Sequence, residues 1–185
     1  NLSYTSLRGE TVRAYEVKLI ANILFEHNVS YKYRESRLLN NGRRATFAFV
    51  IYREHAMPVI IDYVDGDNDN HDEPFLDFVN NHAEYYQFTG EDLLRGEQSV
   101  IDEIKEILDN NDIPYRRLSD DEIWAIIKDR AIDSFTEAVR TFIGRCRKNC
   151  LSPDQLSNMI FEYESDNNIE NEFLIVARDI YKSYV

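Results

Sequence analysis

Acidic residues occur on the first predicted helix and in the third predicted strand, among them Glu16 and Asp62. Glu16 lies in a segment with helical periodicity, and Asp62 lies in VIIDYV, whose continuous apolar run is typical of a strand. Carboxylate oxygens can hold one or two divalent cations that activate a water molecule for hydrolysis. The alternative is structural: Glu16 is a solvated or ion-paired helix residue, and Asp62 is a strand residue near a loop.

A second acidic group follows Asp62 in the loop DGDNDNHDEP (65–74). Asp65, Asp67 and Asp69 alternate as in a calcium-binding loop. Asn70 stands where such a loop needs glycine, and Leu76 stands where it needs a bidentate carboxylate. We therefore expect a solvated acidic loop rather than a calcium site.

Several other chemistries lack their motifs. The sequence has no glycine-rich phosphate loop followed by Lys-Ser/Thr, no GxSxG and no HExxH. Cys146 and Cys150 lie four apart on a predicted helix, without a nearby histidine to complete a zinc site. We expect two reduced thiols in an intracellular, cytoplasmic protein.

Composition limits the classes of partner. The 185 residues are 43% hydrophobic and 12% aromatic, which is typical of a folded chain. With 21 Lys+Arg against 34 Asp+Glu, the net charge is −13. No apolar run is long enough to span a bilayer, so no membrane association is expected. Contact with nucleic acid would need a local basic patch or a larger protein to which this chain belongs.

The elements that must position these residues divide the chain into an αβ half (1–111) and an all-helical half (112–185). The first half reads α-β-β-β-(α)-β-α, with a helix over 9–28, strands over 29–36, 45–54 and 57–64, a short helix over 75–82, a strand from 83 and a helix ending at 110. The second half reads as four helices: one capped by Ser119 with Glu122, one over 133–148, one capped by Ser152 with Pro153 following, and one over 171–184.

The α-β-β-β-α-β order, with acids on the first helix and third strand, is similar to that of restriction-endonuclease-like nucleases. The stretches RAYEVKLIANILFEHNVSYKYRES, EYYQFTGEDLL, NNDIPYRRLSDDEIWAII and FTEAVRTFIGRCRKNCLSPDQL resemble the nuclease-like domain, and the helical region after it, of UvrD and DNA helicase IV type superfamily 1 helicases. This resemblance implies an α+β fold with a restriction-endonuclease-like core followed by a helical bundle. It also implies a DNA-repair setting within a larger helicase chain.

The resemblance also implies a degenerate active site. The helix glutamate matches Glu16, and the third-strand carboxylate matches Asp62. The preceding strand aspartate of the PD-(D/E)XK pattern falls at Thr46 or Ala48, and its lysine falls at Val64. With those groups lost, we expect no cofactor and no catalysis, and Mg²⁺ or Mn²⁺ only if the site is active.

Two basic clusters are candidates for contact with a phosphate backbone. One holds Arg34, Arg37, Arg43 and Arg44; the other holds Arg140, Arg145, Arg147 and Lys148. We single out Arg43, Arg44, Arg145, Arg147 and Lys148, although such charges can instead form solvated faces or internal ion pairs.

Three hypotheses remain open. The first is a degenerate nuclease-like accessory module that contacts DNA or regulates its parent helicase. The second is an acidic protein-interaction module that docks a basic partner or mimics DNA. The third is an active metal-dependent nuclease with a relocated ligand from Asp65, Asp67 or Glu84.

Overall fold

The computed structural model describes residues 3–65, 72–163 and 165–184. Within the described residues, no helix has both the length and the apolar character needed to cross a membrane. The chain forms two compact units, Asn1–Ile123 and Trp124–Val185. The predicted boundary after residue 111 therefore falls inside the first unit.

The first unit is a mixed α+β structure, as predicted. Its elements in chain order are β1 (Tyr4–Thr5), β2 (Thr11–Val12), α1 (Tyr15–Glu26), β3 (Lys32–Leu38), β4 (Arg44–Arg53), β5 (Ala56–Val64), α2 (Glu73–His82), β6 (Glu84–Thr89), α3 (Gly90–Leu94) and α4 (Glu97–Asn110). The small β1–β2 hairpin was not predicted, and it takes up the start of the helix expected over 9–28.

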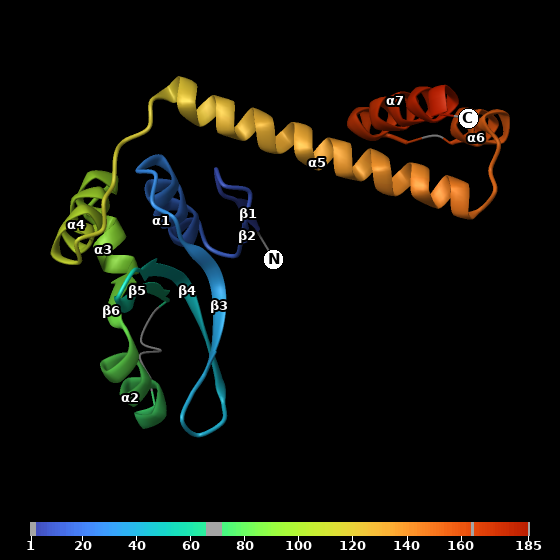
Figure 1. The fold of residues 1–185 in the computed structure, drawn as a ribbon. Coiled ribbons are helices and arrows are strands. Elements are labelled where there is room, and N and C mark those ends of the chain that lie inside the picture. The colour runs from blue at the N-terminus through green and yellow to red at the C-terminus, as the bar shows by residue number, and fades with distance from the viewer. Residues whose placement is uncertain (1–2, 66–71, 164, 185) are drawn as a thin grey trace. The chain divides into compact units, whose positions relative to one another are not determined.

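The main sheet has the order β3-β4-β5-β6 (Figure 1). Strands β3, β4 and β5 pair antiparallel, while β6 pairs parallel to β5 after the connection through α2. Strand β5 is central and its apolar run is buried at Val59, Ile60 and Ile61. A strand covered on both faces needs such a run, which explains why the sequence pattern identified it.

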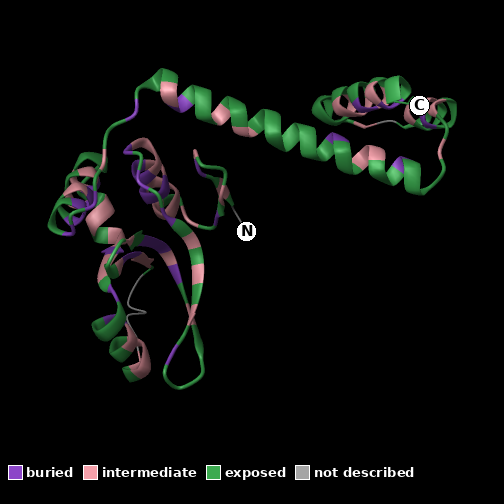
Figure 2. Cartoon of the chain, viewed as in Figure 1, coloured by how far each residue is buried: buried purple, intermediate pink, exposed green. Residues whose placement is uncertain are grey.

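The buried residues of this unit lie along the sheet strands and the helices around them (Figure 2), and they form separate hydrophobic cores on the two faces of the sheet. The α1 face packs Phe49, Ile61 and Phe88 with side chains of α1 and α4. The α2 face packs Phe47 and Ile60 with side chains of α2. The sheet is thus held between helices, and successive residues of β5 face opposite layers.

The segment after α4 belongs to the αβ unit because its backbone is bonded to the end of α1. The Arg116 amide donates to the His27 carbonyl at 3.0 Å, and the Leu118 amide donates to the Glu26 carbonyl at 2.8 Å. Leu118 is also buried. These bonds explain why the compact unit extends past residue 111.

One helix replaces two predicted helices in the C-terminal half. Helix α5 runs unbroken from Asp120 to Lys148, so the predicted break before residue 133 was wrong. The junction around Ala131 holds neither glycine nor proline, and nothing there stops a helix. The Ser119 hydroxyl and the Glu122 carboxylate form the predicted capping box at its start.

Helices α6 (Pro153–Glu162) and α7 (Asn168–Tyr184) pack with α5 in the second unit. Ser152 caps α6 as predicted. The core contains Cys146, Leu156 and Tyr181, and the Tyr181 hydroxyl donates to the Leu151 carbonyl at 2.7 Å. Both cysteines are free thiols, Cys146 buried and Cys150 exposed.

Candidate functional site

An open cleft of about 900 Å³ lies at the N-terminus of α1. The hairpin strands and their connections, the first turn of α1, and β3 each contribute to its walls. The lining residues are Ser3, Tyr4, Thr11, Arg13, Ala14, Tyr15, Glu16 and Arg34. The cleft therefore contains one of the two predicted metal ligands, Glu16, together with two arginines.

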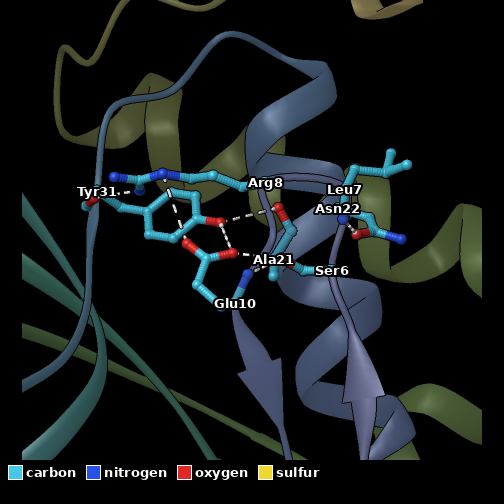
Figure 3. Close-up of polar contacts among 7 residues, drawn as sticks. All are labelled: Ser6, Leu7, Arg8, Glu10, Ala21, Asn22 and Tyr31. Carbon is cyan, nitrogen blue, oxygen red and sulfur yellow. Dashed lines mark hydrogen bonds and ion pairs between the residues drawn. The ribbon is translucent and has the colours of Figure 1, made fainter. Parts of the chain in front are cut away.

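A polar network fixes the hairpin wall of the cleft (Figure 3). The Arg8 guanidinium lies 4.4 Å from the centre of the Tyr31 ring, donates to the Tyr31 carbonyl and forms a 3.5 Å ion pair with Glu10. The Leu7 amide donates to Asn22 Oδ1 of α1 at 2.8 Å. The hairpin is thus bonded to both β3 and α1.

Arg13 and Arg34 have no ion-pair or hydrogen-bond partner among residues 3–65, 72–163 and 165–184. Both are exposed. Burial raises the pKa of the Tyr33 phenol, while Arg34 and, more weakly, Arg13 lower it, so both positive charges act on the same ring. With two guanidinium groups against the one carboxylate of Glu16, the cleft lining has a net positive charge, which favours an anion.

Aromatic rings complete this cleft. The Tyr4 and Tyr15 rings meet edge to face with centroids 6.1 Å apart, and 54% of Tyr15 is exposed. Exposed tyrosine faces beside arginines can stack on a nucleobase or sugar while the cations bind phosphate.

Glu16 and Asp62 lie on opposite faces of the sheet. Ile61 and Tyr63 pack on the α1 face, so the side chain between them, Asp62, points to the α2 face. Glu16 lies on the α1 side: burial raises the pKa of the Tyr63 phenol, and the carboxylates of Glu16 and Asp65 raise it further. The two predicted ligands therefore do not converge.

Asp62 is instead bonded to the neighbouring strand. Its carboxylate accepts a hydrogen bond from the Ala48 amide. Phe47 and Phe49 pack on different faces, although residues two apart on a regular strand share one face. The β4 ladder is thus distorted at Ala48, one of the two positions where the predicted resemblance would place a strand aspartate. Val64, where the resemblance would place a lysine, ends β5.

The remaining acidic candidates give no cation cluster in the described part of the chain. Asp67 and Asp69 lie outside the described residues. No group of three or more His, Cys, Asp or Glu side chains that could hold a metal occurs among the residues that are described. Glu84 begins β6 at the far end of the strand from the carboxyl end where Asp65 follows β5.

The predicted basic residues divide between the two units. Arg43, beside the β3–β4 turn, is ion-paired to Asp72, while Arg44 begins β4. Arg145, Arg147 and Lys148 occupy the last turn of α5. The predicted clusters thus belong to separate units.

Sequence reasoning missed the cleft as a unit. Arg34 was assigned to the β3–β4 hairpin cluster and Arg13 was not singled out. The link between them depends on the β1–β2 hairpin, whose strands are two residues each and carry no periodic pattern. In the sequence, Arg13 is marked no more than as a basic residue near the start of the helix predicted over 9–28.

No protein-family model matches the chain, and neither a curated protein nor a solved structure matches it. The function must therefore be inferred from the residues of this chain.

Proposed function

We propose that this chain is the accessory region of a UvrD-like superfamily 1 DNA helicase, with a degenerate restriction-endonuclease-like core that contacts nucleic acid. The order α1, β3, β4, β5, α2, β6 supports the proposal because it matches the α-β-β-β-α-β order of that class. The quoted stretches of sequence support the helicase assignment. In this proposal the chain works as part of a larger helicase.

The observation that carries the proposal is the pair of cleft arginines, Arg13 and Arg34, that have no partner among the described residues. Arg13 and Arg34 present two positive charges in a chain of net charge −13. A phosphodiester backbone supplies repeated negative charges, and its binding releases counterions. Tyr15 offers a ring face for an unstacked base. Single-stranded DNA fits this combination better than a duplex, whose bases are already stacked.

The loss of nuclease chemistry is part of the same proposal. Asp62 accepts a hydrogen bond from a backbone amide and points away from Glu16, while Ala48 and Val64 supply neither a ligand nor a cation. Without converging carboxylates in the described ranges, a divalent cation has no strong site there from which to activate water. The protein should hold a strand without cutting it.

The test is a titration of labelled single-stranded and forked DNA at several salt concentrations, with and without Mg²⁺ or Mn²⁺. Anisotropy reports binding and product length reports cleavage. For single strands, each phosphate contact contributes about 0.7 to the magnitude of the slope of log K against log salt. Arg13→Ala/Arg34→Ala removes both cleft charges and should therefore lower that magnitude by about 1.4. Lys105→Ala/Lys128→Ala, which removes two lysines outside the cleft lining, is the charge-matched control.

Three results would contradict parts of the proposal. Cation-dependent shortening of the DNA, abolished by Asp62→Ala, would show an active nuclease. Binding with an unchanged salt slope in the double variant would place the contact elsewhere, with Arg43 and Arg44 next to be tested. No binding at low salt would favour the acidic protein-interaction module, which should then bind a basic protein.

A further inference from the structure

The helical unit has an apolar groove that the proposed DNA contact does not use. It lies between α5 and α7 and has a volume of about 400 Å³. Its apolar walls are formed by Phe135, Val139 and Ile143 of α5 and by Ile180 and Tyr184 of α7. We name this the α5–α7 groove.

The α5–α7 groove has aromatic side chains that are incompletely covered. Phe135 is 42% exposed and Tyr184 is 78% exposed, while Val139, which also lines the groove, is buried. Phe135 keeps one edge against Phe173 of α7, at 5.7 Å between ring centroids. Exposed apolar surface bordered by polar residues is typical of a site that binds another protein.

The α5 edge of this groove is positively charged. Arg140 and Arg147 line it, and their spacing of seven residues places them on one side of the helix, about 10.5 Å apart along the axis. Arg140 approaches Glu137 only at 4.0 Å, and Arg147 has no carboxylate partner in the described part of the chain. No acidic residue occurs between positions 140 and 150. The edge therefore keeps its charge in an acidic protein.

We propose that the α5–α7 groove binds an amphipathic helix of another protein, with carboxylates along one edge of its apolar face. Apolar side chains at i, i+4 and i+7 of that helix would enter the groove, as in other helix-in-groove complexes. Carboxylates two turns apart match the spacing of Arg140 and Arg147. The aliphatic floor of Val139, Ile143 and Ile180 offers a phosphate no polar group, so the charge pattern favours a protein over nucleic acid.

The experiment uses the complete chain and two synthetic peptides. Both are helical, with leucines at i, i+4, i+7 and i+11; one carries glutamates beside the leucines and the other carries lysines. Fluorescence anisotropy should show the glutamate peptide binding about tenfold more tightly, because two partly exposed ion pairs contribute together about 1.4 kcal/mol. Arg140→Glu/Arg147→Glu should reverse this preference.

Two controls separate the groove from general charge and from folding. Arg178→Glu, on α7 and outside the groove lining, changes the net charge by the same amount as either groove substitution alone. This control should leave the preference for the glutamate peptide intact. Ile143→Ser should weaken the binding of both peptides, and circular dichroism would show whether this variant folds. If Ile143→Ser does not fold, the Arg140→Glu/Arg147→Glu variant, changed at exposed positions, gives the decisive comparison.

Each other outcome would overturn the proposal. Equal affinity for both peptides, or a preference that the double reversal leaves unchanged, would show that Arg140 and Arg147 do not select the ligand. Binding of an oligonucleotide in place of either peptide would make the groove edge a nucleic-acid surface. A dimer in light scattering that excludes the peptides and is lost in the double variant would make the occupant a second copy.

Discussion

The polar network that holds the β1–β2 hairpin gives a quantitative prediction, because Arg8 connects the hairpin to Tyr31 and also contacts Glu10. Arg8→Ala removes a charged hydrogen bond to the Tyr31 carbonyl, a cation–π contact at 4.4 Å and an ion pair with Glu10. The Arg8 side chain is 44% exposed, which reduces each contribution. Together we expect a loss of about 1.5 kcal/mol in the free energy of local opening.

The assay is amide hydrogen exchange by NMR, residue by residue. The Ser6 amide donates to the Glu10 carbonyl at 3.0 Å and the Leu7 amide donates to Asn22, so both report opening of the hairpin. A loss of about 1.5 kcal/mol should speed their exchange about tenfold. Amides in the buried strand β5, such as that of Ile60, should exchange as before.

The control is Arg13→Ala, which removes an arginine from the same region without removing a bond to any residue that the structure describes. It should leave hairpin exchange unchanged while weakening DNA binding. If Arg8→Ala exchanges at the wild-type rate at Ser6 and Leu7, the network does not hold the hairpin. The geometry of the cleft would then need another support.

Three further predictions concern the stability of the two units, and a fourth concerns pH. Leu108→Ala, in the core beneath the sheet, should cost about 2–5 kcal/mol in a urea titration, and an unchanged midpoint would place Leu108 outside the core. Ser152→Ala should remove the cap of α6 and about 1 kcal/mol, seen as a lower melting temperature of the helical unit. Ala131→Pro should interrupt α5 at a cost of about 3 kcal/mol, whereas two separate helices would tolerate it. The Arg116 guanidinium lowers the pKa of Glu122 from 4.5 to about 2. The contribution of this ion pair to stability is therefore complete above pH 4.5 and is lost as the pH falls towards 2. In Arg116→Gln, an NMR titration should find the pKa of Glu122 raised.

Regular periodic patterns predicted most of the elements. The apolar run at 57–64 identified the central strand because a strand covered on both faces needs apolar residues at every position. The alternation of Val29, Tyr31 and Tyr33 predicted a strand over 29–36, which overlaps β3 (Lys32–Leu38). Ser119 and Ser152 marked helix starts because their hydroxyls accept hydrogen bonds from the first-turn amides.

Elements without a repeating pattern were missed or divided. The β1–β2 hairpin is too short for periodicity, and long-range contacts such as the Leu7 amide with Asn22 stabilise it. The break predicted before Asp133 had no stop signal, and α5 continues through it. The distortion at Ala48 was also beyond sequence reasoning, because it depends on the pairing of two strands.

The candidate site was predicted only residue by residue. Glu16 was named by its match to a helix glutamate in the resemblance, and it does line the cleft. Asp62 was named by likeness, yet the phase of β5 relative to α1 directs it to the other face. A one-residue change in strand phase reverses the face of a side chain, so local sequence cannot place a ligand pair from two elements.

At Arg34, the backbone conformation favours glycine, whereas the cleft needs a positively charged side chain. Arg34 has φ of 53°, in the left-handed region, where the register of β3 and β4 passes from Tyr33–Phe49 to Glu35–Phe47. Glycine would relieve about 1 kcal/mol there, but it would remove a positive charge from the cleft. A library of variants at this position selected for folding should therefore enrich glycine and asparagine, while one selected for ligand capture should retain arginine or lysine. Disagreement between the two enrichments would mark position 34 as kept for its side chain at a cost in backbone energy.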